Sequence, residues 1–448
     1  MRSAFPVRRP VGFVAALIPS ALAPSALIPS ALASSTLALS AVALAASAHA
    51  AASSGAYFPV TAPSAIGAAT PAPARTPVDV LTGGTEGYPV YRIPSMTRLA
   101  TGPRAGRVVL FAEGRGNLGD NGSNDVVMKS SDDGGATWSP LVVVRDEPGR
   151  SLNNPCPVEV REGPHAGRLL LMYQSYREGC GEHCVPEGYE GDDVARTFVM
   201  HSDDGGDTWS EPRDITRSVK RPVRATATAT GPGMGIQLRR GPFKGRVLFG
   251  FNEGPAGKWR VYAAYSDDGG DTWAFGEPAP EASKGVGNEV MLFERDDGAV
   301  VLNARSFYGA ARRKTAVSSD GGEHFTGLVD IAELPDPCCM AGVAVVTDPL
   351  DGAPVQTVVF TGCDSEKERA NGAMWISRDG GRSWPMKLPL FAGGFAYSQP
   401  VALGDDAVLV AFERDGYAAI SVVRRSLPPV EIDPTVTPAV APPSAPRG

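Results

Sequence analysis

The sequence predicts an all-β protein folded as a β-propeller, and two observations carry that prediction. The first is an eight-residue segment of the pattern Ser-x-Asp-Gly-Gly-x-x-aromatic, which occurs five times. The second is the chain between the copies, which holds short β-rich runs and turn residues but no convincing amphipathic helix. Units that recur every several tens of residues form repeat architectures, and hairpins arranged radially form a propeller. The copies occupy residues 131–138, 202–209, 266–273, 318–325 and 377–384.

Each copy of the segment is expected to form a turn. Ser and Asp side chains can bond nearby backbone amides, and consecutive glycines adopt positive φ at no steric cost. Runs of β-forming residues at 125–128, 196–200 and 259–265 lead into the first three copies. Each copy therefore caps a β-hairpin in this interpretation, with its Trp or Phe folded back over the turn. The acidic residues of these turns are interpreted as structural.

Residues 1–50 are interpreted as a secretory signal peptide. Their only charged side chains are arginines near the start, an apolar stretch follows, and an Ala-His-Ala sequence ends at Ala50. Pro19, Pro24 and Pro29 interrupt the apolar stretch, which favours a cleaved signal over a membrane-spanning segment. No other apolar run approaches the ~18 residues that a span needs. We expect cleavage after Ala50 and a secreted mature chain without a membrane span.

The remaining chain divides into three regions. Residues 51–77 are rich in Ala, Pro, Ser and Thr, which predicts a flexible linker, and the Pro-rich residues 428–448 predict a disordered tail. Residues 78–427 have the length of one propeller domain. Loss of the signal peptide changes the net charge from −7 to −10, which predicts a soluble acidic protein and argues against nucleic-acid binding. We expect a monomer that needs no cofactor.

Six cysteines are present, and an exported protein can pair its cysteines. Cys180 and Cys184 are close enough in the sequence to form a loop disulfide. The same stretch, Cys-Gly-Glu-His-Cys, could be taken for a metal site, but a second pair of ligands is missing. The disulfide is therefore favoured, and no metal is expected.

The tetrapeptide Tyr-Arg-Ile-Pro at 91–94 opens the predicted folded region. It resembles the [F/Y]-R-I-P motif of sialidases, and the repeated eight-residue segment resembles their Asp box. From about residue 79 to 425 the chain resembles the bacterial exo-α-sialidases. This resemblance implies a six-bladed β-propeller with Asp-box turns. It also implies an enzyme that removes terminal α-linked sialic acids from glycoproteins, glycolipids or oligosaccharides.

Three arginines match the family's binding site for the sialic acid carboxylate. Arg92 lies in the Tyr-Arg-Ile-Pro motif, Arg305 ends the sequence Asn-Ala-Arg, and Arg369 lies in Glu-Arg-Ala-Asn-Gly. Positions so far apart can meet because a radial fold brings the inner strands of different blades to one axis. Arginine suits this task because its planar fork pairs bidentately with a carboxylate and does not deprotonate.

Three further residues match the family's catalytic groups. Asp120 follows Arg115 in a Gly-Arg-Gly-Asn-Leu-Gly-Asp loop and matches the acid/base, while Arg115 is expected to line the same pocket. Tyr397 in Ala-Tyr-Ser matches the nucleophile, and Glu289 in Gly-Asn-Glu matches its base. A neutral phenol avoids the repulsion that a carboxylate nucleophile would meet beside the carboxylate of the substrate. With an ordinary pKa near ~10, the phenol needs a base to act. Asp120 would protonate the leaving oxygen and then activate water, so that two displacements retain configuration.

Two further positions are expected near the pocket without a catalytic role. Asn154 precedes a proline where many family members have Asp, which predicts a difference in pocket shape or specificity. The Gly-rich stretch 229–236 resembles the family segment beside the glycerol and acyl groups of the substrate, and Met234 is expected to face them. No Lys-Ser/Thr follows this stretch, so it is not a phosphate-binding loop.

Two other functions compete with the sialidase interpretation. A non-catalytic Asp-box propeller that binds sialylated glycans would need the arginines but not Tyr397, Glu289 and Asp120. An Asp-box hydrolase of neutral polysaccharide would need an acidic pair and aromatic platforms, and would have no use for three converging arginines.

Overall fold

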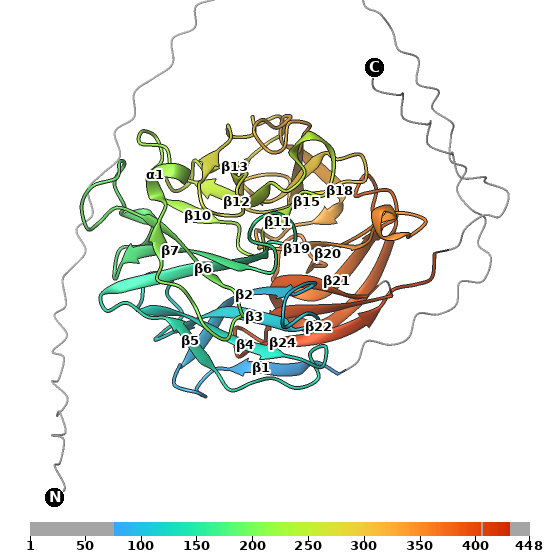
Figure 1. Cartoon of the computed structure of the whole chain (residues 1–448), viewed down its shortest axis with the longest axis horizontal. Helices are drawn as coiled ribbons and strands as arrows, with labels where there is room; N and C mark the ends of the chain where they lie inside the picture. The colour runs from blue at the N-terminus through green and yellow to red at the C-terminus, as the bar shows by residue number, and fades with distance from the viewer. Residues whose placement is uncertain (1–75, 405, 431–448) are drawn as a thin grey trace, which may run out of the picture. The chain divides into compact units, whose positions relative to one another are not determined.

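A computed structural model describes residues 76–404 and 406–430 of the chain (Figure 1). The predicted signal peptide lies outside the described residues, as do the predicted linker 51–77 and tail 428–448 apart from 76–77 and 428–430. The described residues form antiparallel sheets around a common centre, so the all-β, propeller-like fold is confirmed. They contain no apolar helix of membrane-spanning length. Their helical turns are α1 (Thr216–Val219), η1 (Gly181–His183), η2 (Gly241–Phe243) and η3 (Pro349–Asp351).

Four of the sheets are built from consecutive strands, as hairpins joined by tight turns would produce. In the third of them, β10 and β11 both pair with β12. The four sheets are β2 (Val90–Arg98), β3 (Val108–Arg115), β4 (Asn124–Ser131) and β5 (Val142–Arg145); β6 (Arg150–Glu159), β7 (Leu169–Arg177), β8 (Arg196–Ser202) and β9 (Arg213–Asp214); β10 (Thr228–Thr230), β11 (Ile236–Gln237), β12 (Val247–Glu253), β13 (Arg260–Ser266) and β14 (Ala274–Phe275); and β15 (Val286–Glu294), β16 (Val300–Phe307), β17 (Arg312–Ser318) and β18 (Val329–Pro335).

The fifth sheet has seven strands and contains both ends of the folded chain. In it β22 is 19 residues long, and its first part pairs with β21 while the part from Phe395 onward pairs with β23. The predicted count of six blades is therefore not confirmed, because the structure has four separate sheets and one larger sheet. The strand order is β1 (Val78–Thr82), β24 (Ala419–Ser426), β23 (Ala407–Arg414), β22 (Met386–Gly404), β21 (Ala370–Ser377), β20 (Thr357–Cys363) and β19 (Gly342–Thr347).

The hydrophobic core lies between neighbouring sheets. One buried cluster joins Phe111 and Met128, from the β2–β5 sheet, to Leu169 and Tyr173, from the β6–β9 sheet. All eight residues of β3 are buried, which explains its nearly continuous apolar sequence. The strands nearest the centre lie side by side, with β2 next to β6 and β22, and β19 next to β15 and β22 (Figure 1). Side chains from segments far apart in sequence therefore meet at this centre.

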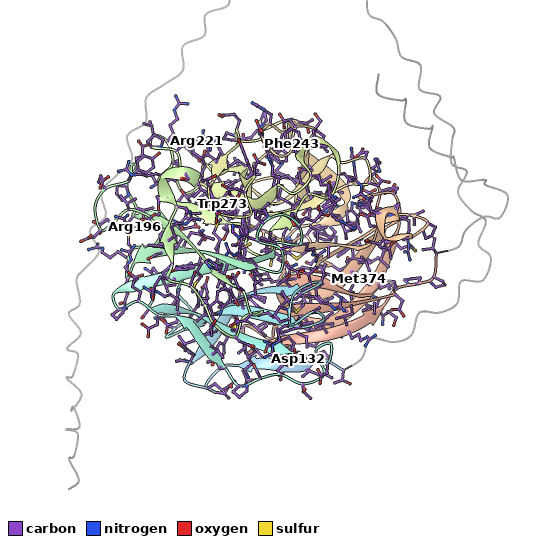
Figure 2. The ribbon with its side chains drawn as sticks, viewed as in Figure 1. Asp132, Arg196, Arg221, Phe243, Trp273 and Met374 are labelled. Carbon is purple, nitrogen blue, oxygen red and sulfur yellow. A yellow bond between two sulfur atoms is a disulfide. The ribbon has the colours of Figure 1, made fainter. Side chains whose placement is uncertain are left out.

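The repeated segment forms the turns that were predicted for it. In the second copy Ser202 Oγ donates to Asp204 Oδ1 (2.8 Å), and the Gly206 and Thr208 amides donate to these two side chains. Burial opposes the charge of Asp204, but the hydrogen bonds from Thr208 and Ser202 lower its pKa to about 2. Trp273 of the third copy, labelled in Figure 2, folds back and donates to the carbonyl oxygen of Gly270 (3.0 Å). The acidic residues of these turns thus stabilise the turns through hydrogen bonds.

Buried arginines link the turn of one sheet to the turn of the next. Arg107 donates from Nε to Asp132 (2.8 Å), labelled in Figure 2, and from Nη1 to Asp207 (2.6 Å) in the following copy. Arg246 makes the same bridge between Asp267 (2.7 Å) and Glu323 (2.9 Å). These bridges lie away from the centre and hold adjacent sheets together.

Replacing Arg107 with Met is expected to lower the free energy of unfolding by about 2 kcal/mol, because the carboxylates of Asp132 and Asp207 lose a buried charged donor. Urea denaturation followed by tryptophan fluorescence measures this change. Arg104→Met is the matched control, since Arg104 pairs with the same Asp207 but its side chain is 45% exposed. Exposed pairs contribute about 1 kcal/mol or less. Equal losses in the two variants would contradict the role of the buried bridge.

Candidate active site

A cavity of about 430 Å³ opens at one end of the innermost strands. It is lined by the first halves of β6 and β15, the inner part of β22, the end of β16 and the loop after β7. Six of the nine residues singled out in the sequence line this cavity: Arg115, Asp120, Asn154, Glu289, Arg305 and Tyr397. Two of the others, Arg92 and Arg369, contact the ring of Tyr397.

Tyr397, Glu289 and Arg305 form one hydrogen-bonded group, although three different strands carry them. The phenol of Tyr397 donates a hydrogen bond to Glu289 Oε1. Arg305 donates from Nη1 to Glu289 Oε2 (2.7 Å) and to the phenol oxygen of Tyr397 (3.0 Å). The carboxylate is therefore placed to accept the phenol proton, and a guanidinium lies beside both groups.

The three predicted arginines surround the ring of Tyr397. The guanidinium carbon of Arg92 lies 5.1 Å from the ring centroid and that of Arg369 lies 5.3 Å from it, while Arg305 bonds the phenol. Arg369 also donates to the Cys338 carbonyl oxygen (3.0 Å), and Arg305 donates to the Cys338 sulfur (3.3 Å). Three positive charges thus converge around one phenol, which makes this place suited to an anionic group.

The surroundings of Tyr397 keep its phenol protonated in the resting protein. Burial raises its pKa well above the ordinary value, and the negative charge of Glu289 raises it further. The positive charges of Arg305, Arg369 and Arg92 oppose this rise. Tyr397 can therefore act as a nucleophile only while a base removes its proton, and the hydrogen bond to Glu289 supplies that base.

Asp120 lies at the open side of the cavity. Its side chain is 79% exposed and accepts a hydrogen bond from Arg115 Nη1 (2.8 Å). Arg115 is buried and also donates from Nε to Glu113 (2.7 Å), a fully buried carboxylate. Burial raises the pKa of Glu113, although Arg115 acts in the opposite direction. The loop thus presents the Asp120 carboxylate to solvent and ligand while Arg115 fixes its position.

Asn154 adopts a left-handed backbone conformation (φ 51°), which Asn tolerates better than most residues. Its amide N–H donates to Glu113 (2.7 Å), and its side chain donates to the carbonyl oxygen of Thr230 (2.9 Å). Asp could not donate this second bond, since an ionised carboxylate only accepts. The Asn in place of the family's Asp is therefore satisfied by its neighbours, and it lies at the wall of the cavity.

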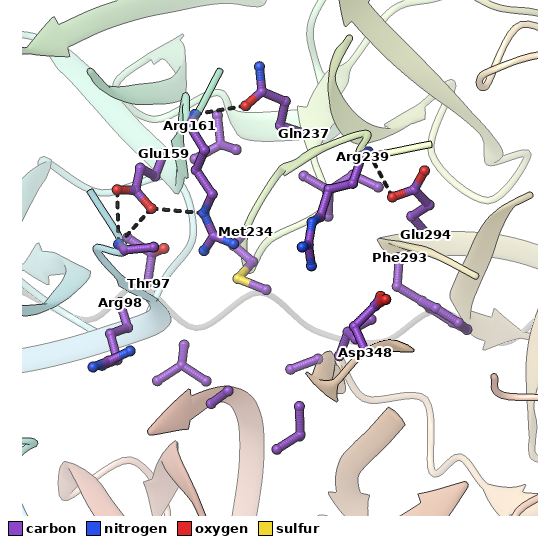
Figure 3. A pocket seen from close by; sticks show the side chains of 18 of the residues that line it. Thr97, Arg98, Glu159, Arg161, Met234, Gln237, Arg239, Phe293, Glu294 and Asp348 are labelled. Atoms are coloured by element: carbon purple, nitrogen blue, oxygen red, sulfur yellow. Dashed lines mark hydrogen bonds and ion pairs between the residues drawn. The ribbon is translucent and has the colours of Figure 1, made fainter. Parts of the chain in front are cut away.

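Met234 does not line this cavity, so the structure does not place it with the other predicted site residues. It lines a second cavity of about 320 Å³ at the other end of the innermost strands. Figure 3 shows Met234 there among Glu159, Arg239 and Asp348. Carboxylates of this second cavity already have hydrogen-bond partners within the protein. Glu159, for example, accepts hydrogen bonds from the backbone amides of residues 100 and 101.

Two buried glutamates that pair with predicted site arginines were missed in the sequence analysis. Glu413 is fully buried, and it accepts from Arg92 Nε (2.6 Å) and from the amide N–H of Ile93 (2.8 Å). Burial opposes the charge of Arg92, but Glu413 overrides this effect, so the pKa of Arg92 is raised. Glu113 plays the same part for Arg115. Each lies near the end of a strand whose preceding residues are apolar, Glu413 on β23 and Glu113 on β3. A carboxylate in such a position needs a buried cation, and this signal could have identified them.

The favoured loop disulfide is confirmed, since Cys180 and Cys184 are bonded. The loop between them contributes Gly181, Glu182 and His183 to the cavity wall. The other four cysteines are free in the structure.

Comparison with known proteins identifies the family. The model of the BNR repeat-like domain matches residues 106–410. A sialidase of Micromonospora viridifaciens is 32% identical over 76% of this chain and 52% of its own length. An exo-alpha-sialidase of Aspergillus fumigatus is 27% identical over 63% of this chain and 67% of its own. The chain thus spans about half the length of the Micromonospora protein.

Solved structures of two sialidase-related proteins have a similar fold. A Hadza microbial sialidase superposes with a TM-score of 0.68 at 23% identity, over 79% of this chain and 69% of its own. The intramolecular trans-sialidase of Ruminococcus gnavus, solved with oseltamivir carboxylate, gives 0.65 at 17% identity, over 80% and 97%. At these identities the likeness concerns the fold alone. The family match covers more than half of the chain, and with the sialidase relatives it confirms the resemblance inferred from the motifs: the protein belongs to the BNR repeat-like, or Asp-box, family.

Proposed function

We propose that this protein is an exo-α-sialidase that hydrolyses terminal α-linked sialic acids of glycoproteins, glycolipids or oligosaccharides with retention of configuration. One observation supports this proposal most strongly. A buried phenol is hydrogen-bonded to a carboxylate and surrounded by three guanidinium groups. A site that binds an acid and attacks the carbon next to it needs these groups together.

In the proposed mechanism Arg92, Arg305 and Arg369 bind the substrate carboxylate. The Tyr397 oxygen attacks the anomeric carbon as its proton passes to Glu289. Asp120 gives a proton to the leaving oxygen, and the glycosidic bond breaks. Asp120 then takes a proton from water, which attacks the anomeric carbon and releases Tyr397, while Glu289 returns the phenol proton. Two inversions leave the product in the configuration of the substrate.

The competing functions explain less of this site. A glycan-binding propeller would use the three arginines, but it would not need a phenol whose proton a carboxylate can accept. A hydrolase of neutral polysaccharide would have no anionic group to place among the guanidinium groups. The pairing of Tyr397 with Glu289 therefore favours a sialidase over both alternatives.

We also propose that the seven-stranded sheet is two blades joined at β22, giving six blades in all. The change of partner at Phe395 divides β22 into an outer strand of one blade and the innermost strand of the next. We propose further that residues 1–50 direct secretion and that the mature chain, with its domain at 78–427, acts outside the cell as a monomer. Mass spectrometry of the exported protein tests the cleavage at Ala50.

Hydrolysis of a fluorogenic α-sialoside tests the activity, and proton NMR of the first product tests its configuration. We expect free sialic acid to appear first as the α anomer and to convert later to the β anomer. Binding of the sialoside without hydrolysis would support the glycan-binding alternative, and initial β product would refute retention.

Asp120→Ala tests the acid role by comparing leaving groups. Loss of the acid is expected to lower kcat/KM for sialyllactose about a hundredfold or more, because general acid catalysis contributes roughly 10² to 10⁴ in rate. An aryl sialoside, whose phenolate leaves without help, should lose much less. Similar losses on both substrates would remove Asp120 from the acid role.

A further inference from the structure

The loop after β7 is built to hold one carboxyl group over the candidate active site. The Cys180–Cys184 bond closes the loop, and η1 between the two cysteines forms part of the cavity wall. Cys180 is buried in a small apolar cluster with Tyr176 and Trp259, which anchors the base of the loop. Glu182 lies in the middle of η1, with its side chain partly buried against the cavity.

This loop is also tied to the loop that carries Asp120. The Gly179 amide donates to the carbonyl oxygen of Asn121 (2.8 Å), and the Asn121 side chain donates back to the Gly179 carbonyl oxygen (3.2 Å). Gly181 has φ +62°, and a Cβ there would lie 3.2 Å from that of Asn121. The two loops therefore pack closely, and Glu182 and Asp120 face the same space.

Several charged groups face Glu182 from the surrounding elements. Glu289 on β15 and Asp120 on the neighbouring loop disfavour a negative charge, while Arg305 on β16 favours one. Tyr176 on β7 lines the same cavity and is affected by the charge of Glu182, and His183 is exposed next to Glu182 in the same loop. Burial has the largest effect and, with the two carboxylates, raises the pKa of Glu182 to about 8. Near neutral pH the cavity thus contains a carboxyl group that can donate a hydrogen bond.

We propose that Glu182, which lines the cavity beside Asp120 and Glu289, is a specificity-determining residue of the site and hydrogen-bonds a polar group of the bound sugar. Its ionisation weakens binding of an anionic substrate, because a third carboxylate then faces the negative charge of the ligand. Glu182 is not needed for bond cleavage. This inference rests on the proposed sialidase function and adds a residue that none of the sialidase motifs contains.

Two substitutions separate the charge of Glu182 from its hydrogen bond. Glu182→Gln keeps a donor but cannot ionise, and Glu182→Leu has neither property. Glu187→Gln is the control, because Glu187 is exposed in the same loop and does not line the cavity. The probe is 2-deoxy-2,3-didehydro-sialic acid, whose Kd is measured by calorimetry between about pH 5.5 and 9.5, with KM and kcat for an aryl sialoside.

As the pH rises through 8, we expect the Kd of the wild type and of Glu187→Gln to increase about tenfold more than the Kd of Glu182→Gln. This is the size expected for one added charge near an anionic ligand. At about pH 6, where Glu182 is protonated, Glu182→Leu should raise KM several-fold and leave kcat unchanged. A pH dependence of Glu182→Gln equal to the wild type, or wild-type binding by Glu182→Leu, would overturn the proposal.

A stability measurement keeps this test independent of the proposed function. A carboxyl whose pKa is higher in the folded protein than in the unfolded chain loses stabilisation as pH rises from about 4.5 to 8. Glu182→Gln should therefore raise Tm at about pH 9 relative to the wild type more than it does at pH 5.5. If the wild type neither binds the probe nor cleaves sialosides, the proposed function fails. If Tm shows no such pH dependence, the inference that the Glu182 carboxyl is neutral near pH 7 is wrong.

Discussion

Replacing Tyr397 with Phe is expected to lower kcat on an α-sialoside by at least about a thousandfold, since the variant lacks the nucleophile of a two-step reaction. The phenyl ring still fills the buried position, and Glu289 keeps its bond to Arg305. We therefore expect the folded protein to remain, with KM changed much less than kcat. Steady-state kinetics with a fluorogenic sialoside and a circular dichroism spectrum measure both effects.

Tyr417→Phe is the matched control for this variant. Tyr417 lies under Arg92 (4.1 Å from the guanidinium carbon to the ring centroid) and accepts a hydrogen bond from Arg369 (2.9 Å), so it contacts two of the same arginines. It is not bonded to Glu289, and loss of its hydroxyl should cost roughly tenfold to a hundredfold in kcat/KM, as for one hydrogen bond from a charged donor. A small effect of Tyr397→Phe, or equal effects of the two substitutions, would show that Tyr397 is not the nucleophile.

Replacing Glu413 with Gln is expected to lower the free energy of unfolding by about 3–5 kcal/mol, because it leaves the buried charge of Arg92 without its partner. Glu413 accepts from Nε (2.6 Å) and Nη2 (3.2 Å) of Arg92 and from the Ile93 amide (2.8 Å), while Gln has one acceptor oxygen and would turn an NH₂ group toward these donors. Chemical denaturation measures the loss.

Glu253→Gln separates the effect on the site from the effect on the fold. Glu253 is also fully buried at the end of an apolar strand, where it pairs with Arg221 (3.0 Å) and Arg260 (2.6 Å) outside the cavity. Both variants should be destabilised, but only Glu413→Gln should also weaken sialoside binding, because it frees Arg92 from its fixed orientation. Unchanged binding in Glu413→Gln would mean that Arg92 does not need Glu413 to meet the substrate.

Local sequence was enough to predict the turns, whereas the resemblance to the sialidase motifs singled out the arginines. The Asp-Gly-Gly segments form their turns from residues within the same eight positions, so no distant contact was needed to predict them. That Arg92, Arg305 and Arg369 would meet followed from the radial fold, since each lies on or beside a strand of a different part of the chain.

Contacts between segments could not be predicted in the same way, and Met234 shows the reason. The stretch that contains it passes through the centre of the fold, where Thr230 contacts Asn154 at one cavity and Met234 reaches the other. Four residues span up to about 13 Å when extended. A residue in the right segment can therefore lie at either end of the innermost strands. The same limit applies to Glu182, whose neighbours Glu289 and Asp120 come from distant strands and loops.

The pairing of β1 with β24 places the first and last strands of the domain next to each other, with Val78 opposite Val422. β1 is synthesised before all other strands of the domain, but it has no partner until β24, the last strand, is also available. Until then two strand edges remain unpaired, and such edges are prone to aggregate. A nonsense mutation before β24 would therefore leave β1 without a partner and both β1 and β23 with an unpaired edge.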